Sequence, residues 1–159
     1  RTSFVIMSCF FIYYAIYIFL PVTGPQFYFK AIGLGNAAHA HFNDIGTYFN
    51  NHQQMLPSPG CEGGFFRSLV ESSHEAGERP TAAFPSSHVG MSTVLMILAY
   101  GRFRRLFWCL MPVFLTLCCS TVYIQAHYFI DVIGGLVSAF LFYHLSQQLY
   151  KWLSPRSAD

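Results

Sequence analysis

The run "YFIDVIGGLVSAFLFYHLSQQLY", residues 128–150, decides the fold class of this chain. It carries a single charged side chain, Asp131, close to its start. A helix rises about 1.5 Å per residue, so a run of this length can cross the hydrocarbon core of a bilayer, which is about 30 Å thick. The run therefore predicts a transmembrane helix. One face of it consists of small side chains that would let a second helix approach closely: Gly134, Gly135, Ser138 and Ala139.

The composition of the whole chain agrees with this prediction. Of its 159 residues, 53% are hydrophobic and only 10% are charged, whereas soluble domains average about 25% charged. The length favours one domain, residues 1–159, and the net charge of +2 is too small to favour nucleic-acid binding. Because the sequence starts at Arg1 rather than Met, we expect that this membrane domain is incomplete at its N-terminus.

Three further apolar runs are candidates for membrane helices. Residues 3–20 and 106–126 are long enough to span a bilayer. The run 87–101 is shorter. We count it as a crossing because the link 102–105 is so short that the run 106–126 must have 87–101 as its partner helix. We therefore expect an all-α, polytopic bundle with four transmembrane helices.

The distribution of positive charge predicts the orientation of this bundle. Cytoplasmic loops of membrane proteins are enriched in Lys and Arg. An alternating topology places one group of cations together on the side that we expect to be cytoplasmic: Arg1, Arg102, Arg104, Arg105, Lys151 and Arg156. Residues 77–88 and 127–131 then meet at the opposite, non-cytoplasmic face.

The long segment 21–86 lies on that non-cytoplasmic side and is too long for a plain linker. Apolar residues recur with helical spacing in "HFNDIGTYFNNHQQML", 41–56, and in "GFFRSLVESSHEAG", 64–77. Both stretches predict amphipathic helices that lie on the membrane surface. The turn-rich stretch 57–64 separates them.

Two polar constellations interrupt the apolar pattern. In "STVYIQAHYFIDVIGG", 120–135, His127 and Asp131 are four residues apart and would share one face of a helix. A carboxylate beside an imidazole fixes its tautomer and stabilises the cation that forms during a reaction. This spacing favours His127 as a nucleophile or base.

The second constellation is "GERPTAAFPSSHVG", residues 77–90. Ser86 is a plausible N-cap of the following helix, and His88 lies in its first turn. The N–H groups near Ser87 and His88 would form an anion site, and the planar guanidinium of Arg79 suits the same anion. Together with the first constellation, these are the groups that phosphoryl transfer requires.

Each group also has a simpler interpretation. His127 and Asp131 could be a structural polar pair between helices. Ser86 could serve only as a cap, and Arg79 could anchor the chain at the interface. The two histidines and the carboxylate could bind zinc, although further ligands are not evident.

The two constellations resemble the motifs of the type 2 phosphatidic acid phosphatases, relatives of the vanadium haloperoxidases. Those motifs read Lys-x6-Arg-Pro, Pro-Ser-Gly-His and Ser-Arg-x5-His-x3-Asp. Here Arg79-Pro80 matches the end of the first motif, and "PSSH", residues 85–88, matches the second with Ser87 in the glycine place. The third motif is matched at the right spacing by Ser120, His127 and Asp131.

This resemblance implies a six-helix membrane core, of which two helices would precede Arg1. It implies a metal-independent phosphatase without a cofactor, which hydrolyses a lipid phosphomonoester at the non-cytoplasmic face of the bilayer. His127 would form a phosphohistidine, His88 would be the acid and Asp131 would orient His127. The positions that it implies for phosphate binding are Arg79, Ser86 and Ser87, with Ser120 and Thr121 as further candidates.

The chain departs from the family pattern at two cations. The lysine of the first motif falls on Ser72, and the arginine of the third motif falls on Thr121. Lys30, Arg67 or His74 could substitute from the surface helices. A third motif without its arginine is also similar to that of the inositol phosphorylceramide synthases, which keeps a phospho-head-group transferase open. An inactive protein that binds phosphorylated lipids is a further alternative.

Overall fold

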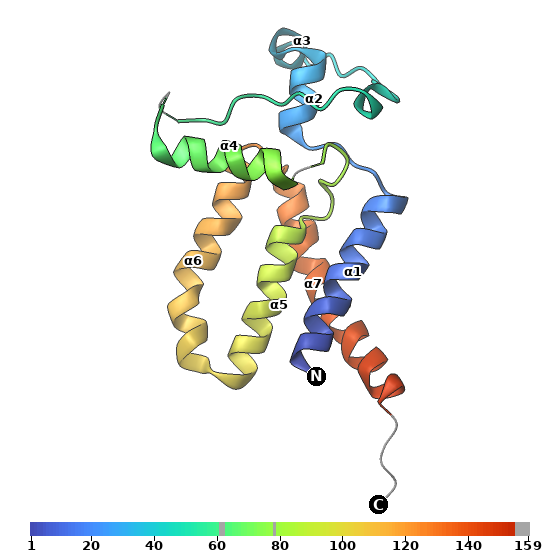
Figure 1. Ribbon diagram of the computed structural model, residues 1–159, viewed down its shortest axis with the longest axis vertical. Helices are drawn as coiled ribbons and strands as arrows, with labels where there is room; N and C mark the ends of the chain where they lie inside the picture. Colours follow the sequence, from blue (N-terminus) through green and yellow to red (C-terminus); the bar gives the residue numbers. More distant parts are fainter. Residues whose placement is uncertain (61–62, 78, 155–159) are drawn as a thin grey trace, which may run out of the picture.

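The computed structural model describes residues 1–60, 63–77 and 79–154, and these residues form an all-α structure (Figure 1). Their only β-type pairing is an isolated parallel bridge between Val22 and Ala82. The elements follow in the order α1 (Thr2–Phe19), α2 (Pro25–Ile32), α3 (Leu34–Ala38), the short 3-10 helix η1 (Tyr48–Asn50), α4 (Phe65–Gly77), α5 (Ser87–Arg102), α6 (Arg104–Tyr123) and α7 (Phe129–Leu153).

The four long helices α1, α5, α6 and α7 correspond to the four apolar runs of the sequence. Among the described residues, α1, α6 and α7 are the helices that are long and apolar enough to cross a membrane. α5 has 16 residues, which correspond to a length of about 24 Å. The all-α class and the three long spans are confirmed, whereas a fourth crossing by α5 stays a prediction.

α5 lies at the centre of the bundle and packs against α1, α6 and α7. A buried cluster joins α1, α5 and α7: Val5, Cys9, Tyr13, Val94, Ala139 and Phe142. Large apolar side chains such as Ile18 and Val137 point outward and are exposed. This distribution is typical of helices whose outer faces contact lipid.

α5 and α7 are in close contact at Gly135. A Cβ atom added there would lie 2.6 Å from the carbonyl oxygen of Ser86 and 3.2 Å from Cβ of Val89. One helical turn further along α7, Ser138 Oγ lies 2.8 Å from the hydroxyl of Tyr13 on α1. The predicted packing face of small residues is therefore confirmed, because no larger side chain fits at Gly135.

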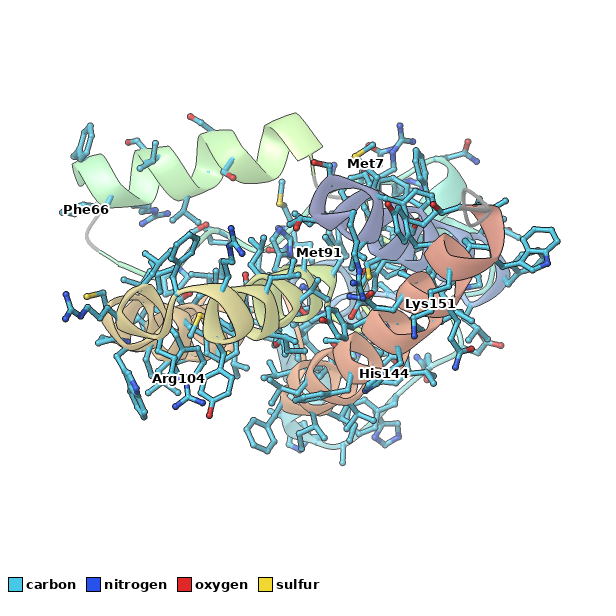
Figure 2. The ribbon with its side chains drawn as sticks, turned by 90° about the horizontal axis from the view of Figure 1, so that it is seen from below. Met7, Phe66, Met91, Arg104, His144 and Lys151 are labelled. Carbon is cyan, nitrogen blue, oxygen red and sulfur yellow. The ribbon has the colours of Figure 1, made fainter. Side chains whose placement is uncertain are left out.

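The two ends of the bundle differ in charge and in the segments of the chain that meet there. At one end, only Phe103 separates α5 from α6, and Figure 2 shows Arg104 and Lys151 near this end. Arg156 lies outside the described residues. At the other end, α5 and α7 begin and α6 stops (Figure 1). The predicted meeting of residues 77–88 with 127–131 at one end of the bundle is confirmed, and the cytoplasmic placement of the basic end stays a prediction.

The segment between α1 and α5 differs in part from the prediction. The amphipathic helix α4 is confirmed, and it runs across the end of the bundle (Figure 1). The predicted helix over residues 41–56 is wrong, because apart from η1 this stretch is irregular. The Asp44 carboxylate accepts a hydrogen bond from Gly46 N at 2.9 Å, and Gly46 adopts a φ of 46°. This local turn competes with a helix.

The apolar face of α4 points away from the bundle. Phe65, Phe66 and Leu69 are exposed, whereas Arg67 and Glu71 on the other side form an ion pair with an N–O distance of 2.8 Å. Among the described residues, α4 packs against no other helix. Its predicted position on the membrane surface agrees with this exposed face and stays a prediction.

Replacing Gly135 by alanine should destabilise the bundle. The new methyl group would collide with the Ser86 carbonyl, and overpacking of this kind costs about 1–3 kcal/mol. Gly101→Ala is the matched control, because a Cβ there meets nothing within 4 Å. We expect thermal unfolding in detergent micelles to show a lower Tm for Gly135→Ala and an unchanged or higher Tm for Gly101→Ala. Equal Tm values for the two variants would contradict the close crossing of α5 and α7.

Candidate active site

A cavity of about 770 Å³ lies between α1, the start of α2, the start of α5 and residues 79–83. The polar residues of its wall include Arg79, Ser87, His88 and His127, which come from the two predicted constellations. Its apolar wall is formed mainly by α1: Phe10, Tyr14, Tyr17 and Ile18. A cavity with a few convergent polar groups and a largely apolar wall is a candidate site for an amphipathic ligand.

His127 lies in the turn before α7, and its side chain is 5% exposed. The prediction that His127 and Asp131 share a helical face is wrong, because α7 begins only at Phe129. The two side chains are nevertheless close, with 3.7 Å between His127 Nδ1 and Asp131 Oδ2. The backbone N–H of His127 donates to the Thr121 carbonyl at 3.1 Å, which ties the turn to the end of α6.

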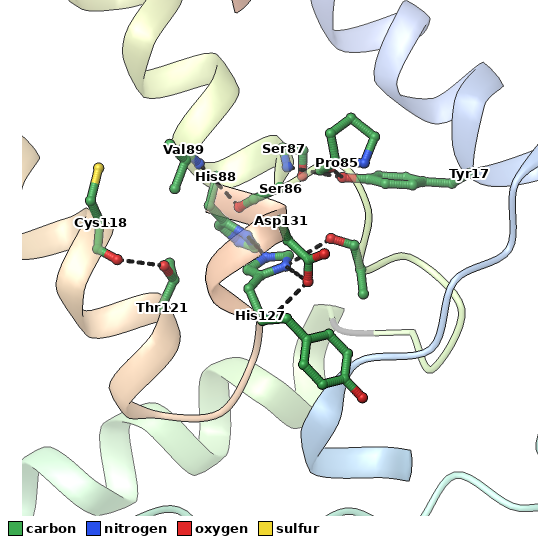
Figure 3. A network of polar contacts seen from close by, with 12 residues as sticks. Tyr17, Pro85, Ser86, Ser87, His88, Val89, Cys118, Thr121, His127 and Asp131 are labelled. Carbon is green, nitrogen blue, oxygen red and sulfur yellow. Dashed lines mark hydrogen bonds and ion pairs between the residues drawn. The ribbon is translucent and has the colours of Figure 1, made fainter. Parts of the chain in front are cut away.

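The strongest partner of the His127 ring is a backbone carbonyl. Nδ1 lies 2.9 Å from the carbonyl oxygen of Ala83, which can only accept a hydrogen bond. The carboxylate of Asp131, at 3.7 Å, is beyond hydrogen-bond distance and acts through its charge. A neutral His127 therefore carries its proton on Nδ1, and the unprotonated Nε2 faces His88 Nδ1 at 3.4 Å (Figure 3).

Backbone pairing with the segment after α1 holds Ala83 in place. Ala83 N donates to the Val22 carbonyl at 3.0 Å, and Gly24 N donates to the Pro80 carbonyl at 3.1 Å. These two bonds align residues 80–83 beside residues 22–24. The acceptor for His127 is thus part of a fixed backbone rather than of a mobile side chain.

Asp131 is 1% exposed and connects the two constellations. Its Oδ2 atom accepts a hydrogen bond from Tyr128 N at 2.8 Å and so caps the start of α7. Its carbonyl accepts from Ser86 N at 3.1 Å, at the start of α5. Burial raises the pKa of Tyr128 to about 12, with a smaller contribution from Asp131, so this phenol stays neutral at physiological pH.

The hydroxyl groups of Ser86 and Tyr17 accept hydrogen bonds from backbone N–H groups in the first turn of α5 (Figure 3). Ser86 Oγ accepts from Val89 N at 3.4 Å, so the predicted N-cap is confirmed. Ser86 is fully buried and does not line the cavity. Ser87 N donates to the Tyr17 hydroxyl at 2.9 Å, and that hydroxyl donates to the Pro85 carbonyl at 2.8 Å.

The two further candidates for phosphate binding, Ser120 and Thr121, do not line the cavity. Ser120 Oγ donates to the Leu117 carbonyl at 2.9 Å, and Thr121 Oγ1 donates to the Cys118 carbonyl at 3.0 Å. Both hydroxyls thus bond within their own helix. Ser72 is exposed on α4.

Arg79 is the only Lys or Arg of the described residues that lines the cavity. Lys30 is exposed on α2 and is not part of the wall. Arg67 pairs with Glu71 on α4. The side chain of His74 lies outside the described part of the chain. In the structure, therefore, the site has one arginine where the family motifs have three cations.

Three groups at the site were not expected from the sequence. The Ala83 carbonyl has no side-chain signature at all. Tyr17 lies in a run rich in aromatic residues, where a hydroxyl gives no separate signal. Gln26, from α2, lines the cavity and is 2% exposed; a polar residue just after a transmembrane run was the one available indication.

The described residues hold no cluster of three or more His, Cys, Asp or Glu side chains arranged to bind a metal ion. His88, His127 and Asp131 are close together, but Nδ1 of His127 bonds to the Ala83 carbonyl, its Nε2 faces His88, and the Asp131 carboxylate accepts from Tyr128 N. This arrangement suits proton transfer and nucleophilic attack better than metal ligation.

Comparisons with known proteins agree with this geometry. The model of the PAP2 superfamily matches residues 1–145. The catalytic subunit aur1 of inositol phosphorylceramide synthase from Schizosaccharomyces pombe is 34% identical over 67 residues. That stretch covers 42% of this chain and 16% of the yeast protein. No solved structure gives a significant match.

We expect neutral His127 to be the Nδ1–H tautomer. Nitrogen NMR of protein labelled with ¹⁵N-histidine should show one Nε2 resonance in the unprotonated range that disappears in His127→Gln. Asp131→Asn should leave this tautomer unchanged, because the Ala83 carbonyl remains 2.9 Å from Nδ1. A switch to Nε2–H in Asp131→Asn would mean that the carboxylate, and not the backbone, sets the tautomer.

Proposed function

Because this chain belongs to the PAP2 superfamily, we propose that it is a membrane enzyme that hydrolyses a lipid phosphomonoester through a phosphohistidine on His127. One observation carries the proposal. His127 Nδ1 is held by the Ala83 carbonyl, and Nε2 faces a cavity that also contains Arg79 and His88. A nucleophile held in this way has little conformational freedom left to lose when substrate binds.

In the first step, Nε2 of His127 attacks phosphorus. The Nε2–P bond forms, and the bond between phosphorus and the lipid oxygen breaks. Protonated His88 gives its proton to the departing alkoxide, so that the lipid leaves as a neutral alcohol. The imidazole of His127 becomes positively charged, and the Asp131 carboxylate, 3.7 Å from Nδ1, stabilises that charge.

In the second step, water attacks the phosphohistidine. His88, now neutral, takes a proton from this water, and the Nε2–P bond breaks to release inorganic phosphate. His127 returns to its Nδ1–H form, because Nδ1 keeps its proton throughout. The guanidinium of Arg79 stabilises the negative charge on the phosphoryl oxygens in both steps.

His88 must move for this chemistry. The phosphorus atom would start about 3–3.5 Å from the attacking nitrogen, yet His88 Nδ1 already lies 3.4 Å from Nε2. Substrate therefore separates the two rings as it enters. His88 is exposed on the cavity side of α5, whereas His127 is buried, so we assign the movement to His88.

The apolar wall of the cavity supports a lipid substrate. Phe10, Tyr14 and Ile18 line the cavity and are also exposed on the outer side of α1. A phosphate bound near His127 could thus have its hydrocarbon tail beside α1. We propose that this end of the bundle is at the non-cytoplasmic face, because the cations of the α5–α6 turn lie at the opposite end.

A second candidate function is the transfer of a phospho-head-group to a lipid alcohol. The similarity to a catalytic subunit of inositol phosphorylceramide synthase favours it. The single arginine of the cavity wall also suits a phosphodiester, which carries one negative charge, better than a doubly charged monoester. The mechanism changes only in the second step, where an alcohol replaces water.

Loss of the nucleophile should abolish turnover. His127→Ala is expected to release no product from a lipid phosphate, while His144→Ala, a change on the exposed outer side of α7, should keep normal activity. Asp131→Asn should slow the reaction by less than the factor of about 10⁴ found where a carboxylate alone sets the tautomer, because Ala83 holds Nδ1 here. Activity of His127→Ala within several-fold of wild type would overturn the covalent mechanism.

The identity of the product separates the candidates. Vesicles that contain a lipid phosphomonoester should yield inorganic phosphate, and the rate should be unchanged by EDTA, since no step of the mechanism uses a metal ion. Vesicles that contain a phosphoinositol lipid and ceramide should yield a phosphoinositol-ceramide only if the protein is a transferase. Loss of activity in EDTA with recovery in zinc would make the two histidines and Asp131 metal ligands. No product from either mixture would favour an inactive lipid-binding protein.

A further inference from the structure

A tyrosine of α1 reaches the start of α5 inside the cavity. The Tyr17 hydroxyl accepts a hydrogen bond from Ser87 N at 2.9 Å and donates one to the Pro85 carbonyl at 2.8 Å (Figure 3). Tyr17 and Ser87 both line the cavity beside His127. Tyr17 lies 62 positions before Arg79 in the numbering and belongs to none of the matched motifs.

The Ser87 N–H is a group that a phosphate would use. It belongs to the first turn of α5, where backbone N–H groups have no partner within the helix and attract anions. In the structure this N–H is bonded to a neutral hydroxyl oxygen. A phosphate oxygen is a stronger acceptor, because hydrogen bonds to charged groups are roughly twice as strong as neutral ones.

We propose that the Tyr17 hydroxyl occupies the position of a phosphoryl oxygen and that bound phosphate displaces it from Ser87 N. This inference rests on the proposed function, because it assumes that the phosphate lies between Arg79 and His127. Tyr17 is then a positioning residue. It sets how tightly the site binds phosphate, and it links the occupancy of the site to the position of α1.

The expected size of the effect follows from the bond that must be broken. A neutral hydrogen bond in a protein changes an equilibrium constant by a factor of about five. Tyr17→Phe removes the competing oxygen and keeps the ring, so phosphate should bind about fivefold more tightly. Displacement takes place before the chemical step, so KM should fall by a similar factor while kcat changes less than about twofold.

The experiment measures binding and turnover separately. Inorganic phosphate and orthovanadate are titrated against the full chain in detergent micelles by calorimetry, and kcat and KM are measured with a lipid phosphomonoester. Tyr14→Phe is the matched control, because Tyr14 lines the same cavity on α1 and packs against the rings of Phe10 and Tyr17. We expect tighter binding of both anions by Tyr17→Phe and unchanged binding by Tyr14→Phe.

Two results would overturn the proposal. Weaker anion binding by Tyr17→Phe together with a lower Tm would make Tyr17 a structural tie for the 85–87 turn. Unchanged binding would mean that phosphate does not use the Ser87 amide. Should Tyr17→Phe not fold, a second measurement replaces it. The Ser87 amide resonance of wild-type protein labelled with ¹⁵N-serine is assigned by its loss in Ser87→Ala. A shift of this resonance on phosphate titration supports displacement, and no shift contradicts it.

The measurement of anion binding also distinguishes a failure of this proposal from a failure of the proposed function. If the protein has no turnover but Tyr17→Phe binds phosphate more tightly, the role of Tyr17 stands and the catalytic assignment fails. If turnover is normal but the anion affinity does not respond to Tyr17, the catalytic assignment stands and the role of Tyr17 fails. Absence of phosphate and vanadate binding in the wild type would overturn both.

Discussion

The close crossing of α5 and α7 is the constraint on which the rest of the structure depends. At Gly135 the α7 backbone lies against the Ser86 carbonyl, with no space for a Cβ atom. A few residues away, Ser86 N donates to the Asp131 carbonyl. The starts of both helices are therefore fixed to each other by backbone contacts. His88 and His127 are held within hydrogen-bond distance because each lies beside one of these helix starts.

The site is built more from backbone groups than its motifs suggest. The Ala83 carbonyl orients His127, the Thr121 carbonyl holds the turn that carries it, and Asp131 caps α7 as well as facing the imidazole. Side chains that bond to a fixed backbone keep their geometry without further support. The position of the His127 ring is thus set by backbone groups before a ligand arrives.

Most of the fold and about half of the site could be predicted from the sequence. The apolar runs and the predicted N-cap identify the long helices. The distribution of Lys and Arg, with an alternating topology, predicts that the two constellations lie at the same end of the bundle. The helix predicted over 41–56 failed because an Asp44–Gly46 turn competes locally with helical periodicity. The roles of Ala83 and Tyr17 could not be foreseen, because they arise from contacts between segments far apart in the chain.

The order of the two constellations along the chain has a consequence for biogenesis. One constellation ends in the first turn of α5 and the other surrounds the start of α7, so the ribosome makes half of the site before the other half. A chain arrested before α7 would hold Arg79 and His88 without His127. The complete candidate site therefore forms only once α7 has packed against α5.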